Sequence, residues 1–156
     1  MIDVEIPGYG LLELEHLVTD FSGTLSEDGK LIHGTRNKLN RLSEKLQIHV
    51  LTSDTFGSAE KEIEGINCNL HVLKGDRHVF QKEKYILDLG ANGVVAFGNG
   101  NNDVNMLRAA KLGICVCLKE GCSVEALTAS KILVMSPIDA IDLLLYPKRL
   151  IATLRR

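Results

Sequence analysis

The chain has 156 residues and a mass of 17.1 kDa, a size that suits one domain. Eighteen Lys and Arg residues oppose twenty Asp and Glu residues, and only 4% of the residues are aromatic. A nucleic-acid partner calls for excess positive charge and for aromatic side chains that stack on bases, so this composition argues against one. The 45% of hydrophobic residues supply enough apolar surface for a core, which argues against intrinsic disorder.

No apolar run approaches the roughly 20 residues that a membrane span needs, and acidic residues interrupt the first 15 positions, where a secretory signal would be basic and then apolar. We therefore expect a soluble, cytoplasmic protein without a membrane partner. The four cysteines, Cys68, Cys115, Cys117 and Cys122, have no zinc-like spacing, and we expect reduced, mostly buried thiols.

In chain order, the first predicted element is a hairpin with strands at 3–6 and 11–15 around Pro7, Gly8 and Gly10, which we expect at an edge. It opens a single domain, 1–156, in which residues 16–145 form the core and residues 146–156 a basic tail.

Short apolar runs then alternate with helical patterns. The predicted strands are 16–19, 48–51, 70–73, 94–97, 113–116 and 132–135, and the predicted helices are 35–46, 58–64, 79–89, 103–110, 123–129 and 138–145. Continuously apolar strands need helices on both faces, so the pattern predicts a doubly wound, Rossmann-like α/β fold with a mostly parallel sheet. Ligands of such sheets bind beyond the carboxyl ends of the strands.

Four segments near those ends carry polar chemistry. They are Asp20-Phe-Ser-Gly-Thr-Leu after the first strand of the core, Thr52-Ser-Asp after the second, Lys82 within a helix, and Gly98-Asn-Gly-Asn-Asn-Asp103 after a later strand. In order and position they resemble the haloacid dehalogenase superfamily, whose pattern is D-x-x-G-T, then Thr or Ser, then Lys, then G-D-G-x-x-D. The resemblance extends from Leu17 to about Met135. Within the superfamily the motifs are most similar to the phosphorylation domain of P-type ATPases.

The resemblance implies a Mg²⁺-dependent phosphohydrolase or phosphotransferase whose substrate is a small phosphorylated molecule or a phosphoprotein. Asp20 would attack the phosphoryl group and form an aspartyl-phosphate, with Ser22, Thr52 and Lys82 as the other catalytic positions. The phosphate contacts expected from it are Gly23, Thr24, Thr52, Ser53 and Lys82, and the Mg²⁺ ligands are Asp20, Ser22, Asn99 and Asp103. Simpler roles are open: Asp20 could start a turn, Thr52 could cap a helix, and Lys82 could be one of several solvated lysines.

Two positions depart from the superfamily pattern. Hydrolytic members usually carry a second Asp as general acid and base where this chain has Ser22, and a metal-binding Asp where it has Asn99. Loss of a general acid-base costs about 10² to 10⁴ in rate, so dephosphorylation should be slow and the substrates should have good leaving groups, as ATP-like, acyl and aryl phosphates do. An amide is a weaker ligand than a carboxylate, so we expect an Mg²⁺ affinity of about millimolar.

Only thirty-one residues separate Asp20 from Thr52, which leaves no room for a cap domain. What fits there is a small flap, 26–34, with a hairpin turn at Asp28-Gly29. The open crevice would then be closed by a large substrate or by a neighbouring subunit of a homo-oligomer. The C-terminal segment 143–156, which includes the basic tail, could dock on such a subunit or pack on its own domain.

The sequence allows three other functions to be compared with this one. A dinucleotide site is disfavoured because Asp103 replaces the third glycine of G-x-G-x-x-G, and a Walker loop is excluded because the chain has no Gly-Lys-Ser or Gly-Lys-Thr. The remaining rival is a catalytically degenerate module that binds phosphate or a protein without turnover. The five histidines show no paired spacing and are interpreted as structural.

Overall fold

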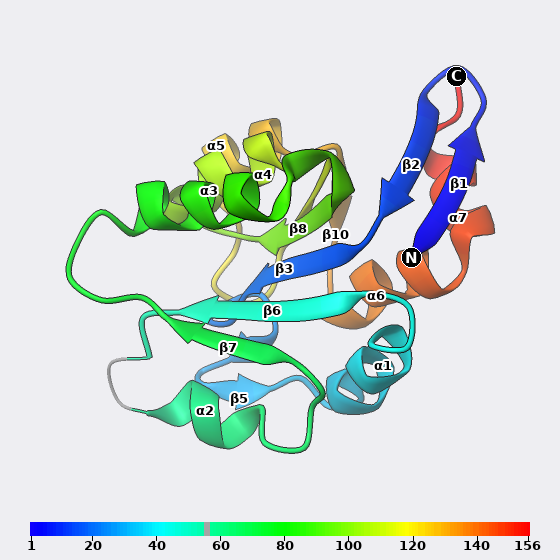
Figure 1. Ribbon diagram of the computed structural model, residues 1–156. Helices are drawn as coiled ribbons and strands as arrows, with labels where there is room; N and C mark the ends of the chain where they lie inside the picture. Colours follow the sequence, from blue (N-terminus) through cyan, green and yellow to red (C-terminus); the bar gives the residue numbers. More distant parts are fainter. Residues whose placement is uncertain (55–56) are drawn as a thin grey trace.

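The computed structural model describes residues 1–54 and 57–156, and its centre is a six-stranded sheet (Figure 1). The order across the sheet is β10 (Ile132–Val134), β9 (Leu112–Val116), β8 (Val94–Gly98), β3 (His16–Asp20), β6 (Gln47–Thr52) and β7 (Asn69–Val72). Every neighbouring pair in this sheet is parallel. The predicted doubly wound α/β fold is confirmed, and the carboxyl ends of β3, β6 and β8 meet at one edge.

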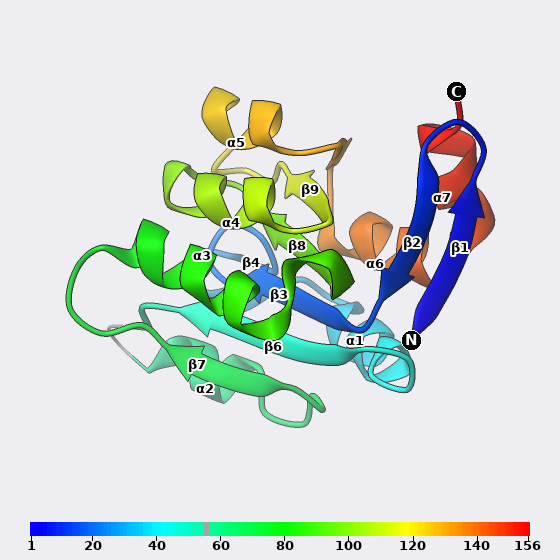
Figure 2. The same ribbon diagram turned by 45° about the horizontal axis from the view of Figure 1, so that its top comes forward.

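Helices cover both faces of the sheet (Figures 1 and 2). One face carries α3 (His78–Leu89), α4 (Val104–Ala109) and α5 (Val124–Ala129), and the other α1 (Thr35–Leu42), α2 (Ser58–Glu62) and α6 (Pro137–Leu145). Side chains alternate between the faces along a strand, so each strand feeds two cores. Leu17 and Phe97 belong to the cluster beneath α1 and α6, whereas Val18 and Ala96 belong to the cluster beneath α3 and α4.

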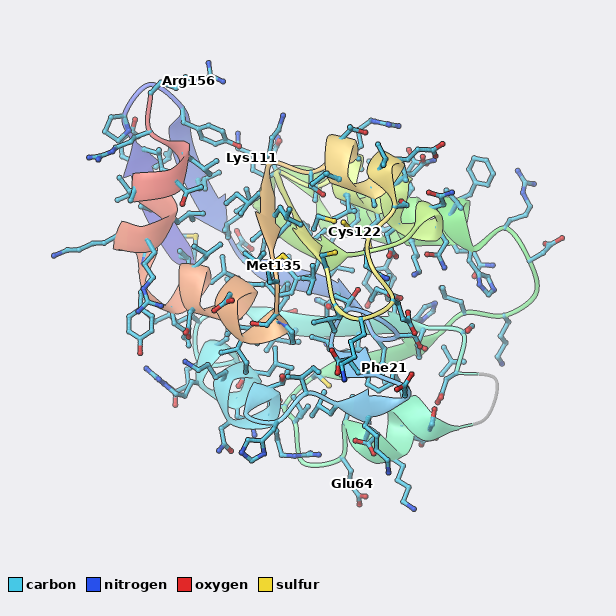
Figure 3. The ribbon with its side chains drawn as sticks, turned by 180° about the vertical axis from the view of Figure 1, so that it is seen from behind. Phe21, Glu64, Lys111, Cys122, Met135 and Arg156 are labelled. Atoms are coloured by element: carbon cyan, nitrogen blue, oxygen red, sulfur yellow. The ribbon has the colours of Figure 1, made fainter. Side chains whose placement is uncertain are left out.

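The N-terminal hairpin, β1 (Ile2–Ile6) and β2 (Gly10–Leu14), is antiparallel and forms a sheet of its own. The sequence predicts this hairpin at an edge of the sheet, but the hairpin does not pair with the main sheet. Only Glu15 separates β2 from β3, and the hairpin projects beyond the amino end of β3 (Figure 1). The last helix, α7 (Pro147–Leu154), packs on β1 through the buried Leu150. The Arg156 N–H donates to the Pro7 carbonyl at 2.9 Å, at the outer tip of the hairpin (Figure 3). The tail therefore packs on its own domain.

The flap consists of two short strands, β4 (Ser26–Glu27) and β5 (Lys30–Leu31), with left-handed backbone at Asp28 and Gly29 as the predicted turn requires. No cap domain is present among the described residues. The largest difference in helix bounds is at α1, which ends at Leu42 rather than at residue 46 because tight turns follow it. In the described parts of the chain no helix has the length and apolarity to cross a membrane.

The cysteines are free thiols in the structure. Cys115 is buried, and the other three are half-buried, so the expectation of mostly buried thiols is only partly met. Burial, and then the neighbouring Cys122, raise the pKa of the Cys115 thiol to about 12, so this thiol is protonated at neutral pH.

A row of aromatic and imidazole side chains crosses the sheet surface beneath α3. His49 Nε2 lies 3.1 Å from His16 Nδ1, and His49 Nδ1 lies 2.8 Å from the Tyr85 hydroxyl. His49 is only 4% exposed. Burial, and then the proximity of His16, lower the pKa of His49 to about 4, so His49 is held neutral in the folded protein.

His49 should therefore weaken folding in mild acid. The unfolded chain binds a proton at His49 near pH 6.5 but the folded chain only near pH 4, so the stability that neutral His49 contributes is full above pH 6.5 and falls as the pH drops between these values. We expect this contribution to fall by roughly 1–3 kcal/mol across the interval, measured by urea unfolding as the difference between wild type and His49→Gln, because other buried groups titrate in the same range. Replacement of the exposed His33 by Gln should leave the pH dependence unchanged. Equal slopes in both variants would contradict this assignment.

Candidate active site

A buried ammonium group joins two carboxylates at the carboxyl edge of the sheet. Asp20 is the last residue of β3, Lys82 lies on α3, and Asp103 ends the 3₁₀ turn Asn101–Asp103 that follows β8. Lys82 Nζ donates to Asp20 Oδ1 at 2.9 Å and to Asp103 Oδ1 at 2.7 Å. Lys82 is 1% exposed, Asp20 7% and Asp103 0%, so this is a buried ion cluster. Lys84, two residues along α3, instead lies exposed and pairs with Asp88.

The charges in this cluster depend on one another. Burial, and then the nearby Asp103, raise the pKa of Asp20 to about 7, against the opposing pull of the Lys82 ammonium. Burial alone would lower the Lys82 pKa, but Asp20 and Asp103 outweigh burial and raise it above its ordinary value. Lys82 is therefore a permanent cation beside the Asp20 carboxylate.

Asp103 holds the loop that follows β8. While its Oδ1 accepts from Lys82, its Oδ2 accepts from the backbone N–H groups of Asn99 (3.0 Å) and Gly100 (3.1 Å). Any side chain at Gly98 would lie 2.6 Å from Asp103 Cβ, so glycine is required there. Both oxygens of Asp103 already have protein donors, and its positioning role was not expected from the sequence. The metal contact predicted for Asp103 stays a prediction.

Oxygen atoms gather around the Asn99 side chain. Thr24 Oγ1 donates to Asn99 Oδ1 at 3.0 Å. With the amide rotated by 180°, its nitrogen would instead donate to Asp20 Oδ2 at 3.3 Å and to the Ser22 carbonyl at 3.2 Å. The position of Asn99 Oδ1 thus suits either an N–H group that donates to Asp20 and Ser22, or an oxygen that binds the same cation as the oxygens of those two residues. Adjacent Mg²⁺ ligands at about 2.1 Å from the ion stand about 3 Å apart, so the oxygens of Asp20, Ser22 and Asn99 fit a divalent cation.

A polar cavity of about 290 Å³ opens beside Asp20 and Lys82. Of the residues predicted for catalysis and phosphate or metal contact, its wall contains Asp20, Ser22, Thr52, Ser53, Lys82 and Asn99. Thr52 does not cap α2: the Asp54 carboxylate accepts from the N–H groups of Ala59 and Glu60 instead. The buried Thr52 hydroxyl accepts from the Asp54 N–H at 3.1 Å and can still donate its proton.

Two predicted phosphate contacts lie elsewhere. Gly23 and Thr24 are buried behind the cavity wall, where Thr24 Oγ1 lies within hydrogen-bond distance of Asp20 Oδ2 (3.3 Å). Thr24 thus supports the Asp20 carboxylate from behind.

The cavity wall also holds Gly100 and Asn102 of the predicted loop after β8, and three residues that sequence reasoning missed: Leu73, His78 and Glu120. His78 was interpreted as structural, but it is the first residue of α3 and lies one helical turn before Lys82, so it faces the same cavity. That i, i+4 spacing was the available signal. Glu120 lies in a loop with no recognisable pattern.

The structure combines a parallel α/β sheet, a carboxylate at the end of a central strand, a buried lysine and a cluster of oxygen atoms that fits a cation. This combination is typical of α/β enzymes whose active site lies at the carboxyl edge of the sheet. The chain belongs to the haloacid dehalogenase-like hydrolase family, which it matches over residues 31–119, more than half of its length. The matched span begins after Asp20. This membership confirms the superfamily suggested by the motifs.

The chain is also similar to several known proteins. It is 48% identical over 62 residues to an uncharacterized protein of Methanocaldococcus jannaschii, a region of 40% of this chain and 67% of that protein. Its fold is similar to the 3-deoxy-D-manno-octulosonate 8-phosphate phosphatase of Moraxella catarrhalis in complex with a magnesium ion, a phosphate ion and a KDO molecule (TM-score 0.71, 15% identity, 91% and 94% of the two chains). A similar fold is found in the cobalt-bound phosphatase of that type from Haemophilus influenzae (TM-score 0.70, 12% identity, 92% and 94%).

Removing the Lys82 charge should destabilise the fold. In Lys82→Met two buried carboxylates lose their shared counter-ion, and breaking a buried ion pair in this way costs about 3–5 kcal/mol. The matched control, Lys84→Met, removes an exposed pair, which costs about 0–1 kcal/mol. Urea unfolding at neutral pH without divalent cations measures both. Similar small losses in the two variants would contradict the buried ion cluster.

Proposed function

We propose that this chain is a Mg²⁺-dependent phosphohydrolase or phosphotransferase that works through an aspartyl-phosphate on Asp20. The observation that carries the proposal is the Asp20 carboxylate itself, which ends a central strand, lines a polar cavity and lies 2.9 Å from a buried lysine ammonium. Membership in a hydrolase family supports the same reaction class. A small phosphorylated molecule or a phosphoprotein is the proposed substrate.

The chain's own groups suit an in-line displacement. A carboxylate oxygen of Asp20 attacks phosphorus, the bond from phosphorus to the leaving oxygen breaks, and the leaving group departs with its electron pair. Lys82 carries a fixed positive charge toward the transferring group, and the hydroxyls of Thr52 and Ser53 supply donors on the same wall. Mg²⁺, held by Asp20, the Ser22 carbonyl and Asn99, would supply further charge neutralisation.

The second half of the reaction is proposed to be slow. Water must attack the aspartyl-phosphate and return Asp20, and the side chain at position 22 is an exposed serine, which is no base near pH 7. Its hydroxyl also cannot protonate a poor leaving group efficiently. ATP-like, acyl and aryl phosphates are therefore the proposed donors. Slow dephosphorylation also agrees with the proposed likeness to the phosphorylation domain of P-type ATPases, which rests on the sequence motifs.

Aryl-phosphate hydrolysis in the presence of Mg²⁺ tests the nucleophile. Asp20→Asn should abolish it, because an amide does not attack phosphorus. Ser22→Asp introduces a general acid-base and should raise kcat by about 10² to 10⁴, the range typical of such groups. Ser53→Asp, on the same cavity wall, is the matched control and should not raise kcat. Equal rates in wild type and Asp20→Asn would remove Asp20 from the reaction.

Slow hydrolysis should leave a detectable covalent adduct. Acid quench after mixing with acetyl phosphate and Mg²⁺, followed by mass spectrometry of peptides, should find phosphate on Asp20 in the wild type, with less of it in Ser22→Asp. The adduct should disappear in hydroxylamine, which cleaves acyl phosphates. Turnover without any adduct on Asp20 would argue for direct attack by water instead.

A non-catalytic module that binds phosphate or a protein is the second candidate. The observations that favour it are the serine at position 22 and the neutral amide at position 99, each in the place of an acid. Phosphate retention without turnover of any donor, and without an adduct, would support this candidate over the enzyme.

A further inference from the structure

The carboxylate of Glu120 reaches the proposed cation site from a loop outside every motif. This loop, 117–122, links β9 to α5, and Glu120 lines the cavity with Asp20 and Ser22. A Cβ atom placed on Gly23 would lie 2.3 Å from Glu120 Oε2 and 2.6 Å from Asn99 Nδ2. Because Gly23 has no Cβ atom, the Glu120 carboxylate and the Asn99 amide can both lie close to its backbone.

Hydrogen bonds fasten this loop to the segment that carries Asn99. The Ser123 N–H donates to the Asn99 carbonyl at 2.8 Å, and Asn99 Nδ2 donates to the Gly121 carbonyl at 3.4 Å. The Cys117 N–H donates to the Val134 carbonyl at 2.9 Å, which fixes the other end of the loop to β10. Glu120 is therefore carried by a segment with a defined position relative to Asn99, although its own side chain is exposed.

The net charge of the proposed cation site favours one more acidic residue. Asp20 and Asp103 contribute two negative charges and Lys82 removes one, so a divalent cation would meet a single net negative charge. The amide at position 99 adds none. Glu120 brings the net charge to minus two, which equals the charge of the ion in magnitude.

We propose that Glu120 is an additional acidic residue of the cation site, which acts from beyond the direct ligands to raise the affinity for a divalent cation and so offsets the neutral Asn99. The proposal rests on the proposed function, because it takes the oxygens of Asp20, Ser22 and Asn99 as the ligands. In chemical terms the ligand is a hard divalent cation such as Mg²⁺ or Mn²⁺, which prefers oxygen.

Cation binding without substrate tests the proposal. Free Mn²⁺ is followed by electron paramagnetic resonance during titration of wild type, Glu120→Gln and the matched control Glu125→Gln, which removes an exposed carboxylate on α5 outside the cavity wall. A unit charge roughly 6 Å from a divalent ion in a water-like dielectric changes affinity about tenfold. Glu120→Gln should therefore weaken binding about five- to tenfold, and Glu125→Gln less than twofold.

A compensating variant and a direct-ligand variant complete the test. Asn99→Asp combined with Glu120→Gln should return the Mn²⁺ affinity to the wild-type value or above it, because the carboxylate moves to a ligand position. Asp20→Asn should weaken binding more than Glu120→Gln. Wild-type affinity in Glu120→Gln, with loss in Asp20→Asn, would overturn the role of Glu120 and leave the proposed function standing. Mn²⁺ binding that is absent from wild type or unchanged in Asp20→Asn would overturn both this role and the metal part of the proposed function.

Discussion

The ammonium group of Lys82, shared between Asp20 and Asp103, is the interaction on which the site depends. It joins the end of β3, the middle of α3 and the turn after β8, three segments that are far apart in sequence. Burying three charges carries a large desolvation cost, and short contacts at 2.7 and 2.9 Å with further backbone donors to Asp103 offset it. The cluster therefore fixes the Asp20 carboxylate in a defined place at the edge of the sheet.

The strand order brings the other site residues next to this cluster. The parallel order of β8, β3 and β6 places the loops that follow these strands next to one another, so that Asn99, Asp20 and Thr52 share one cavity. The flap after Asp20 has strands of only two residues, and no cap domain lies over the cavity in the described structure. No described segment covers the cavity, and closure by a large substrate or by a neighbouring subunit stays a proposal.

Much of this arrangement could be predicted from sequence because it depends on local patterns. Asp20, Thr52 and Asn99 directly follow or end apolar strands, and parallel strands bring such positions together. The role of Asp103 in holding Lys82 and two backbone N–H groups was not predicted, since it depends on the distance between α3 and the loop after β8. Glu120 was missed for a similar reason: its loop has no motif, and only the absent side chain of Gly23 and the contact with the Asn99 segment bring it to the cavity.

A crystal structure with Mg²⁺ and fluoroberyllate, a mimic of a phosphoryl group bound to a carboxylate, tests the central claim most directly. The account predicts beryllium bonded to an oxygen of Asp20, fluorine atoms in contact with Lys82 Nζ and Thr52 Oγ1, and Mg²⁺ on the oxygens of Asp20, Ser22 and Asn99. A cavity without either group at saturating concentrations, or fluoroberyllate bound away from Asp20, would contradict it.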